Sequence, residues 1–246
     1  MLNDNVFKPS NKLFIMDGKL LGKVEELVKL EYDKLTCWAH GWLHIRKVER
    51  NAEELAKIIG IDPFVCGIAA YCHDLGRVVE EETSGKETAL GNIDHSLFSV
   101  EPTTLLLQKV GINGYNFSSI VGAVTVHSDK LYYGKNLVAK VLRDCDKKDS
   151  LGPFGTLRHV RHHFNVDFVD TYDIMKYQDD YEQIERLANE TLKVIKLSEE
   201  TKTKYLKVLD FVLEWVDNKM LDLNESYDFL NKHYQYTKHS KEFLLS

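Results

Sequence analysis

The sequence lacks the features that mark secreted and membrane proteins. Its four cysteines show no CxxC spacing and are too few for a disulfide-rich secreted domain, so we expect reduced thiols. No stretch reaches the run of about 18 apolar residues that a membrane-spanning helix needs. Residues 1–15 lack the apolar core of a signal peptide. Together these absences predict a cytoplasmic protein that does not use a membrane as a partner.

An excess of basic residues is also absent. The 246 residues include 32 Lys and Arg against 38 Asp and Glu, which gives a formal net charge of -6. A nucleic-acid scaffold needs surplus cations to meet the phosphate backbone, so this balance argues against such a role. A small phosphorylated substrate would need only a local basic patch. Hydrophobic residues make up 43% of the chain, which is ordinary for a globular protein with a substantial core.

The chain does contain a series of helical patterns. In the clearest one, apolar residues recur at intervals of three and four before Gly60: Ile45, Val48, Ala52, Leu55 and Ile59. Asp62 and Pro63 suit the N-cap and the first residue of the next helix. Further helices are predicted over about residues 20–34, 64–75, 118–127, 137–145, 149–163, 184–195 and 206–216, with a weaker pattern over 227–234. We find no internal repeat, linker or parallel-sheet pattern, and therefore predict one all-α domain over residues 19–246 behind a loosely structured lead-in over 1–18.

Two segments between these patterns are expected to be irregular. Residues 80–92 are polar and contain Gly85 and Gly91, which predicts a loop. A helix is expected to resume near Asp94, and Pro102 should either kink it or restart it.

The most informative stretch is a His-Asp pair at the end of an apolar helical pattern. His73 and Asp74 lie in the sequence YCHDLGR, and an imidazole beside a carboxylate suits a divalent cation such as Mn, Fe, Ni, Zn or Mg. Adjacent residues on a helix point about 100° apart, so the two side chains can converge on one ion only at a helix end or bend. Gly76 is predicted to supply that end, as a C-cap residue with positive φ.

Two other segments carry candidate ligands, and each has an ordinary structural explanation. His44 lies four residues before Val48, and so on the inward face of its helix, where a histidine is more often a hydrogen-bonded core residue. Asp146 lies in a charged run that could simply be solvated. Asp74 could likewise cap a helix or pair with Arg77. Each residue alone is a weak signal, and their combination is the stronger one.

Together these residues form the order H…HD…D, with His73 29 positions after His44 and Asp146 72 positions after Asp74. This order resembles the HD superfamily of metal-dependent phosphohydrolases. The stretches AHGWLHIRKVERNA, HDLGR and DCDKKDSLGPFGTLR resemble three motifs of one bacterial branch, typified by the YedJ and YpgQ proteins. The resemblance covers roughly residues 35–165, and the helices predicted over 180–236 fit it in kind. It implies a single helical bundle of the HD type.

The resemblance also implies a metal site. His44, His73, Asp74 and Asp146 match its ligands, for one or two divalent ions among Mn, Mg, Fe, Ni and Co. His95 and His127 fall where related members place extra histidines, which serve a second ion or the substrate phosphate.

The sequence departs from the branch at two places. The family usually follows the first extra histidine with Glu and small residues, whereas this chain has Ser, Leu, Phe and Ser after His95, and then Pro102. The branch favours an Asp where Gly41 follows His40. These departures leave the second ion and the role of His40 open.

The implied chemistry is hydrolysis by a metal-activated water. A divalent ion lowers the pKa of a bound water from about 15.7 towards 7 and orients a phosphorus atom for attack. Asp74 could bridge two ions, and His95 and His127 could transfer a proton or bind the phosphate. Cationic partners for the substrate phosphate are expected at Arg77, Lys147 and Arg158. The rest of the run 158–163 could merely complement a helix dipole.

The expected substrate is a phosphorylated small molecule, in the first place a nucleotide, and the branch implies nucleoside triphosphate pyrophosphohydrolysis. Two other functions stay open. One is an HD-type module that binds a nucleotide and senses it without turnover. The other is a di-iron oxygenase, in which His95 and His127 would both bind iron. The amphipathic C-terminal helices could pack within the domain or pair two chains as a homodimer.

Overall fold

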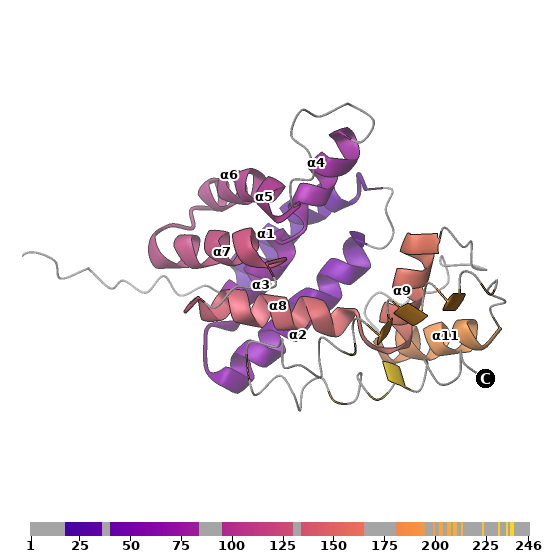
Figure 1. Cartoon of the computed structure of the whole chain (residues 1–246). Coiled ribbons are helices and arrows are strands. Elements are labelled where there is room, and N and C mark those ends of the chain that lie inside the picture. The colour runs from indigo at the N-terminus through magenta and orange to yellow at the C-terminus, as the bar shows by residue number, and fades with distance from the viewer. Residues whose placement is uncertain are drawn as a thin grey trace, which may run out of the picture.

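The computed structural model describes residues 18–35, 40–83, 95–129, 134–164 and 181–194, together with single positions between 199 and 238. All regular secondary structure in these residues is helical, which confirms the predicted all-α class. None of the helices in this part of the chain is both long and apolar enough to cross a membrane. The helices, shown in Figure 1, are α1 (Gly18–Tyr32), α2 (Trp42–Ile59), α3 (Pro63–Cys72), α4 (Leu75–Thr83), α5 (His95–Phe98), α6 (Val100–Val110), α7 (Gly114–Val126), α8 (Leu137–Asp149), α9 (Gly152–Phe164) and α11 (Tyr181–Val194).

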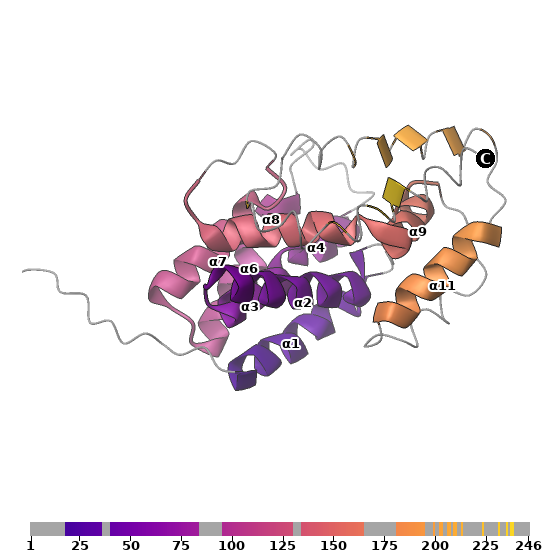
Figure 2. The same ribbon diagram turned by 90° about the horizontal axis from the view of Figure 1, so that it is seen from below.

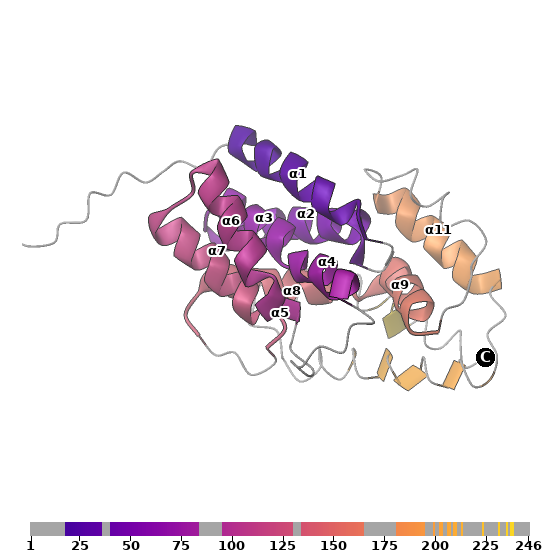
Figure 3. The same cartoon turned by 90° about the horizontal axis from the view of Figure 1, so that it is seen from above.

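Helices α2, α3 and α8 form the centre of the bundle. Figure 2 shows α8 on one side of α2 and α3 and α1 on the other. In Figure 3, α6 and α7 stand at one end of the molecule, and α9 and α11 pack together at the other. The core is apolar and closely filled, with its largest fully buried side chains at Tyr32, Tyr71, Phe154, Ile45, Leu55 and Ile68. The three central helices thereby hold their inward side chains in fixed positions.

The ends of the central helices follow the predicted signals. Gly60 adopts the left-handed conformation after α2, and its backbone N–H donates to the carbonyl oxygen of Ala56. Asp62 caps α3 by accepting hydrogen bonds from the backbone N–H groups of Phe64 and Val65. Both predictions are confirmed. The sequence could make them because each helix end depends on backbone chemistry within a few residues.

The prediction for Gly76 is wrong. The described glycines with positive φ are Gly60, Gly111, Gly114 and Gly152, whereas Gly76 is the second residue of helix α4. The break that separates His73 from α4 is instead a turn at His73 and Asp74 themselves. Glycine stands here because of a close approach: a Cβ would lie 2.2 Å from the backbone oxygen of His95 and 2.7 Å from the backbone nitrogen of Ser99.

Other boundaries differ by a few residues. Helix α4 continues to Thr83, so the loop expected from residue 80 begins later than predicted, and residues 84–94 lie outside the described residues. The chain restarts as α6 after Ser99, with Pro102 in its first turn, which confirms the expected restart. Helix α8 is capped by Asn136 and runs to Asp149, four residues beyond its apolar pattern, because its last turn carries charged residues. Of the expected lead-in, only Gly18 is described, and it begins α1.

The C-terminal half of the chain agrees with the prediction where it is described. Helix α9 begins at Gly152, three residues after the predicted start, and α11 begins at Tyr181, three residues before its pattern. The described positions within residues 206–216 are helical, as predicted.

Candidate metal centre

Three helices bring the four candidate ligands to one place. His44 is the third residue of α2, His73 caps the end of α3, and Asp74 follows in the turn before α4. Asp146 comes from the last turn of α8. His73 and Asp74 thus lie at a helix end, which is where two adjacent side chains were expected to converge.

The ligand atoms of this first cluster lie within reach of a single ion. The Nε2 atom of His44 is 3.3 Å from the Nε2 atom of His73. It is also 3.7 Å from Oδ2 of Asp74 and 3.6 Å from Oδ1 of Asp146. The Nε2 atom of His73 is 3.7 Å from the same Asp74 oxygen and 4.0 Å from the same Asp146 oxygen. His44, His73 and Asp74 are each at most 3% exposed, so the cluster is buried.

The tautomers of the two histidines leave their Nε2 lone pairs facing each other. The Nδ1 atom of His73 lies 2.6 Å from the carbonyl oxygen of Ala70, which can only accept, so Nδ1 carries the proton. The Nδ1 atom of His44 likewise lies 2.6 Å from an Asp149 carboxylate oxygen. Two Nε2 lone pairs 3.3 Å apart cannot hydrogen-bond to each other, and a cation between them relieves their repulsion. The residues present therefore fit a divalent metal ion.

The charges of the first cluster also suit a divalent ion. Burial lowers the pKa of His73 to about 4, so this imidazole is neutral at neutral pH. Burial alone would raise the pKa of Asp74, but His73 and the other nearby imidazoles lower it well below its usual range. The pKa of Asp146 is lowered in the same way, against burial, by Lys147 and the two histidines. Neutral imidazoles and ionised carboxylates are the forms that bind a metal.

A second cluster lies on the other oxygen of Asp74. Its Oδ1 atom is 3.3 Å from Nε2 of His95 and 3.6 Å from Nε2 of His127, and these two nitrogens are 3.1 Å apart. The Nδ1 atom of His127 lies 2.7 Å from the carbonyl oxygen of Val124, so its Nε2 atom is free to accept or to bind a metal. A hydrogen bond from His95 to His127 satisfies this pair without an ion, in contrast to the first cluster. Asp74 therefore stands between two groups of ligands.

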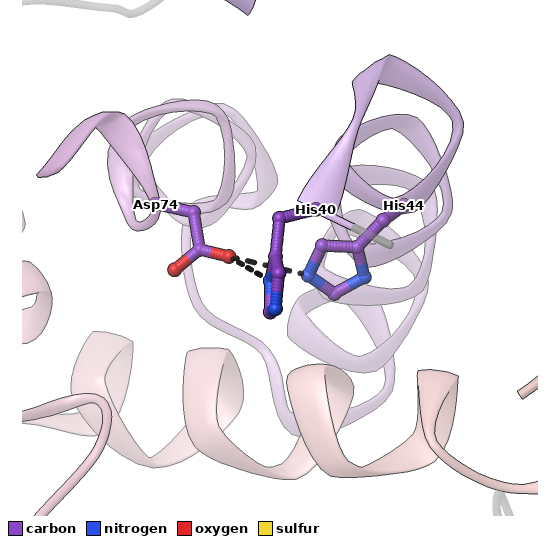
Figure 4. Close-up of side chains that lie close together, drawn as sticks. All are labelled: His40, His44 and Asp74. Carbon is purple, nitrogen blue, oxygen red and sulfur yellow. Dashed lines mark hydrogen bonds and ion pairs between the residues drawn. The ribbon is translucent and has the colours of Figure 1, made fainter. Parts of the chain in front are cut away.

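His40 is a residue of the site that the sequence did not assign. Its Nδ1 atom lies 2.9 Å from Oδ2 of Asp74, and Figure 4 shows His40 and His44 facing the same carboxylate. Burial lowers the pKa of His40 to about 4, although Asp74 acts in the opposite direction. The signal in the sequence was its position four residues before His44, although it precedes the start of α2.

Two of the expected cationic residues lie beside the clusters. The Nη1 atom of Arg77 binds Glu80 at 2.7 Å, while its Nε atom lies 3.8 Å from Oδ1 of Asp74 and has no hydrogen-bond partner. The Nζ atom of Lys147 lies 3.1 Å from Oδ2 of Asp146, and about a quarter of this side chain is exposed. Both cations therefore lie beside the candidate ligands.

The third expected cation takes a different position. Arg158 is buried, and its Nη2 atom lies 3.3 Å from Oδ2 of Asp149, on the Nδ1 side of the His44 ring. That side faces away from the first cluster. The side chains of residues 159–163 lie outside the described residues.

Residues 41–151 match the family model of the HD domain, and this range contains all four candidate ligands. This part of the chain is therefore an HD domain, the domain type of metal-dependent phosphohydrolases.

Solved structures with the same fold include proteins of two bacteria. A protein of Lactobacillus plantarum is 13% identical, with a TM-score of 0.57, and the match covers 93% of this chain and 97% of that one. YpgQ of Bacillus subtilis, in complex with ADP, is 16% identical with a TM-score of 0.52, and the match covers 92% and 93% of the two chains. Comparison with curated proteins finds no significant match. At these identities the likeness concerns the fold alone.

Proposed function

We propose that this protein hydrolyses a phosphoester or phosphoanhydride bond of a nucleotide, with a divalent ion held by His44, His73, Asp74 and Asp146. One observation carries the proposal: two imidazole lone pairs 3.3 Å apart stand beside two ionised carboxylates. This arrangement is unfavourable without a cation and favourable with one. Mn, Mg, Fe, Ni and Co all accept such a mixed set of ligands.

When bound, the ion supplies Lewis acidity, which lowers the pKa of water and neutralises charge on a phosphoryl oxygen. Two imidazoles and two carboxylates leave open positions on an ion that prefers six ligands. The buried walls of the site keep its charges poorly screened, so each contact with a phosphate is stronger than in water. His73 stays neutral in this environment because burial disfavours its charged form.

Asp74 and the second cluster supply the proton chemistry of this proposal. His127 accepts through Nε2 because its Nδ1 atom donates to a backbone carbonyl. His95 adjoins it at 3.1 Å, so the pair can hold a proton, bind a substrate phosphate, or take a second ion with Oδ1 of Asp74. We propose one ion at the first cluster for catalysis and leave the second cluster to the substrate or to a further ion.

Arg77 and Lys147 are the proposed partners of the substrate phosphate. The Nε atom of Arg77 has no hydrogen-bond partner and lies on the Asp74 side of the site. An anion there would satisfy that buried donor. Arg158 also keeps a place in the proposal, but its contact with Asp149 suits support of His44 better than contact with substrate.

A nucleotide is the first substrate class to test. The resemblance of three sequence motifs to the YpgQ branch implies nucleoside triphosphate pyrophosphohydrolysis, and YpgQ has been solved with ADP. Both points support a nucleotide, while the likeness of the two structures reaches only the fold.

The test is release of phosphate and pyrophosphate from a panel of nucleotides and a generic phosphoester. The protein is chelated and then supplied with Mn, Mg, Co or Ni. Asp74→Ala removes the carboxylate shared by both clusters, and Glu49→Gln neutralises a buried carboxylate on α2 that pairs with Arg46 instead. We expect metal-dependent turnover that is lost in Asp74→Ala and kept in Glu49→Gln. If the protein binds metal but releases neither phosphate nor pyrophosphate from any substrate of the panel, hydrolysis is contradicted and a sensor module is favoured.

One observation also favours a second candidate function. Asp74 faces His44 and His73 with one oxygen and His95 and His127 with the other, which is a ligand set that could hold two irons. Such a centre is used by di-iron oxygenases of the HD fold. Purification with iron separates the two functions, because an oxygenase should show a di-iron charge-transfer band and no phosphate release.

A further inference from the structure

The last residue of helix α8 is the hub of a buried polar network behind the first cluster. Asp149 is 1% exposed, and one of its oxygens lies 2.6 Å from Nδ1 of His44. The same oxygen lies 3.3 Å from Nη2 of Arg158, and the other lies 3.2 Å from Nζ of Lys47. Asp149 is not one of the four candidate ligands, so its burial among these three partners needs another explanation.

The contact with Asp149 decides which ring nitrogen of His44 carries the proton. An ionised carboxylate can only accept, so Nδ1 of His44 must donate to Asp149. The lone pair is then left on Nε2, the atom that faces His73, Asp74 and Asp146. The opposite tautomer would place a proton on Nε2 and prevent it from binding a metal.

Two cations lie against Asp149 and favour its charged, acceptor-only form. Nζ of Lys47 is 3.2 Å from one of its oxygens, and Nη2 of Arg158 is 3.3 Å from the other. Lys47 lies one turn after His44 on α2, and Arg158 comes from α9. The charged form of Asp149, on α8, thus depends on residues from two other helices.

The network continues to a helix outside the matched HD domain. Nζ of Lys47 lies 2.9 Å from Oε1 of Glu185 on α11, and it stands 4.3 Å over the ring of Phe154. The other oxygen of Glu185 accepts a hydrogen bond of 3.0 Å from the backbone N–H of Phe154. Glu185 thereby holds Lys47 against the start of α9. A continuous chain of contacts joins α11 to a ligand of the metal centre.

We infer that Asp149 is a positioning residue that fixes His44 in its metal-binding tautomer, and that Glu185 on α11 supports it through Lys47. This inference rests on the proposed metal centre. It extends that centre beyond residues 41–151, because helix α11 then contributes to metal affinity without touching the ion.

The first measurement is ring-nitrogen NMR of histidine-labelled, metal-free protein, with the His44 signals assigned through His44→Gln. We expect a single tautomer protonated at Nδ1 in the wild type. In Asp149→Asn the amide can donate as well as accept, so the His44 signals should shift towards the Nε2-protonated form. A wild-type His44 protonated at Nε2 would overturn the inference without any variant, even if Asp149→Asn did not fold.

The second measurement is Mn affinity by calorimetry. Loss of an outer partner of a ligating histidine typically weakens metal binding about 10–100-fold, and we expect a loss of that size in Asp149→Asn. Glu49→Gln also replaces a buried carboxyl group that pairs with a cation, but it should leave both the affinity and the tautomer unchanged. Glu185→Gln should weaken binding by less than Asp149→Asn.

The outcomes separate the inference from the function that it rests on. If the wild type binds no Mn, the proposed metal centre fails. If the wild type binds Mn and Asp149→Asn binds it equally well with the same tautomer, only the positioning role fails. Wild-type affinity in Glu185→Gln would exclude the contribution of α11 alone.

Discussion

Replacement of Gly76 by alanine should destabilise the protein, although helix propensity alone predicts the reverse. Gly76 lies inside α4, and alanine is favoured over glycine in a helix by about 0.5–1 kcal/mol. The steric effect is opposite and larger. A Cβ would lie 2.2 Å from the backbone oxygen of His95, more than 1 Å short of an ordinary contact, and 2.8 Å from Oγ of Ser99.

The neighbours of Gly76 cannot yield cheaply, because two of the three crowded atoms belong to the backbone. Overpacking of this kind typically costs about 1–3 kcal/mol, and sometimes more. The displacement would also break the hydrogen bond of 2.8 Å from the backbone N–H of Gly76 to Oγ of Ser99. An unsatisfied buried donor costs about 1–3 kcal/mol. We therefore expect a net loss of about 3 kcal/mol in the free energy of unfolding.

The assay is urea denaturation followed by circular dichroism, with Gly22→Ala as the matched control. Gly22 lies inside α1, and a Cβ there would meet nothing within 4 Å. That variant should gain about 0.5–1 kcal/mol by propensity alone. The steric argument is refuted if Gly76→Ala is as stable as the wild type. A correct argument also predicts weaker metal binding in Gly76→Ala, because the displaced turn carries two candidate ligands.

The remaining predictions concern the ligands, their protonation and the turn that holds them. Asp146→Asn should abolish high-affinity Mn binding by calorimetry, whereas Asp144→Asn, two residues earlier on α8 and outside the clusters, should retain it. Equal losses in both variants would contradict the ligand assignment. The pKa values of His40 and His73 fall from the usual 6.5 to about 4 in the folded protein, so the unfolded chain binds more protons between these pH values. The free energy of unfolding of the metal-free protein should therefore fall as the pH drops from about 6.5 to 4, and a flat profile from urea titrations would disprove these shifts. Ser99→Ala removes the hydroxyl that donates to the backbone oxygen of His73 at 2.7 Å, and it should cost about 1–3 kcal/mol in the same assay.

The amino-acid sequence predicted most of the described helices and singled out the candidate ligands. Intervals of three and four specify α2, and Gly60, Asp62 and Pro63 specify its end and the start of α3, because these effects act within a few residues. The order of His44, His73-Asp74 and Asp146 pointed to the HD family for a similar reason. Metal chemistry restricts the residue types, and their spacing along the chain can be read directly.

The sequence did not predict contacts between segments that are far apart along the chain. Gly76 is required by a backbone atom of α5, which lies 19 residues further along the chain, and not by its own φ angle. His40 joins the site through Asp74, 34 residues away. Sequence patterns within a few residues predict neither contact, because each depends on how α2, α4 and α5 pack.

The same limit explains the cationic residues. Arg77, Lys147 and Arg158 are equally charged in the sequence, but the packing of α8 and α9 buries Arg158 against Asp149 and leaves the other two beside the clusters. Charge and spacing thus identify which residues can bind a metal or a phosphate. Only the packed helices assign each charge its partner, since the partner lies on another helix and the energy of a buried charge depends on that partner.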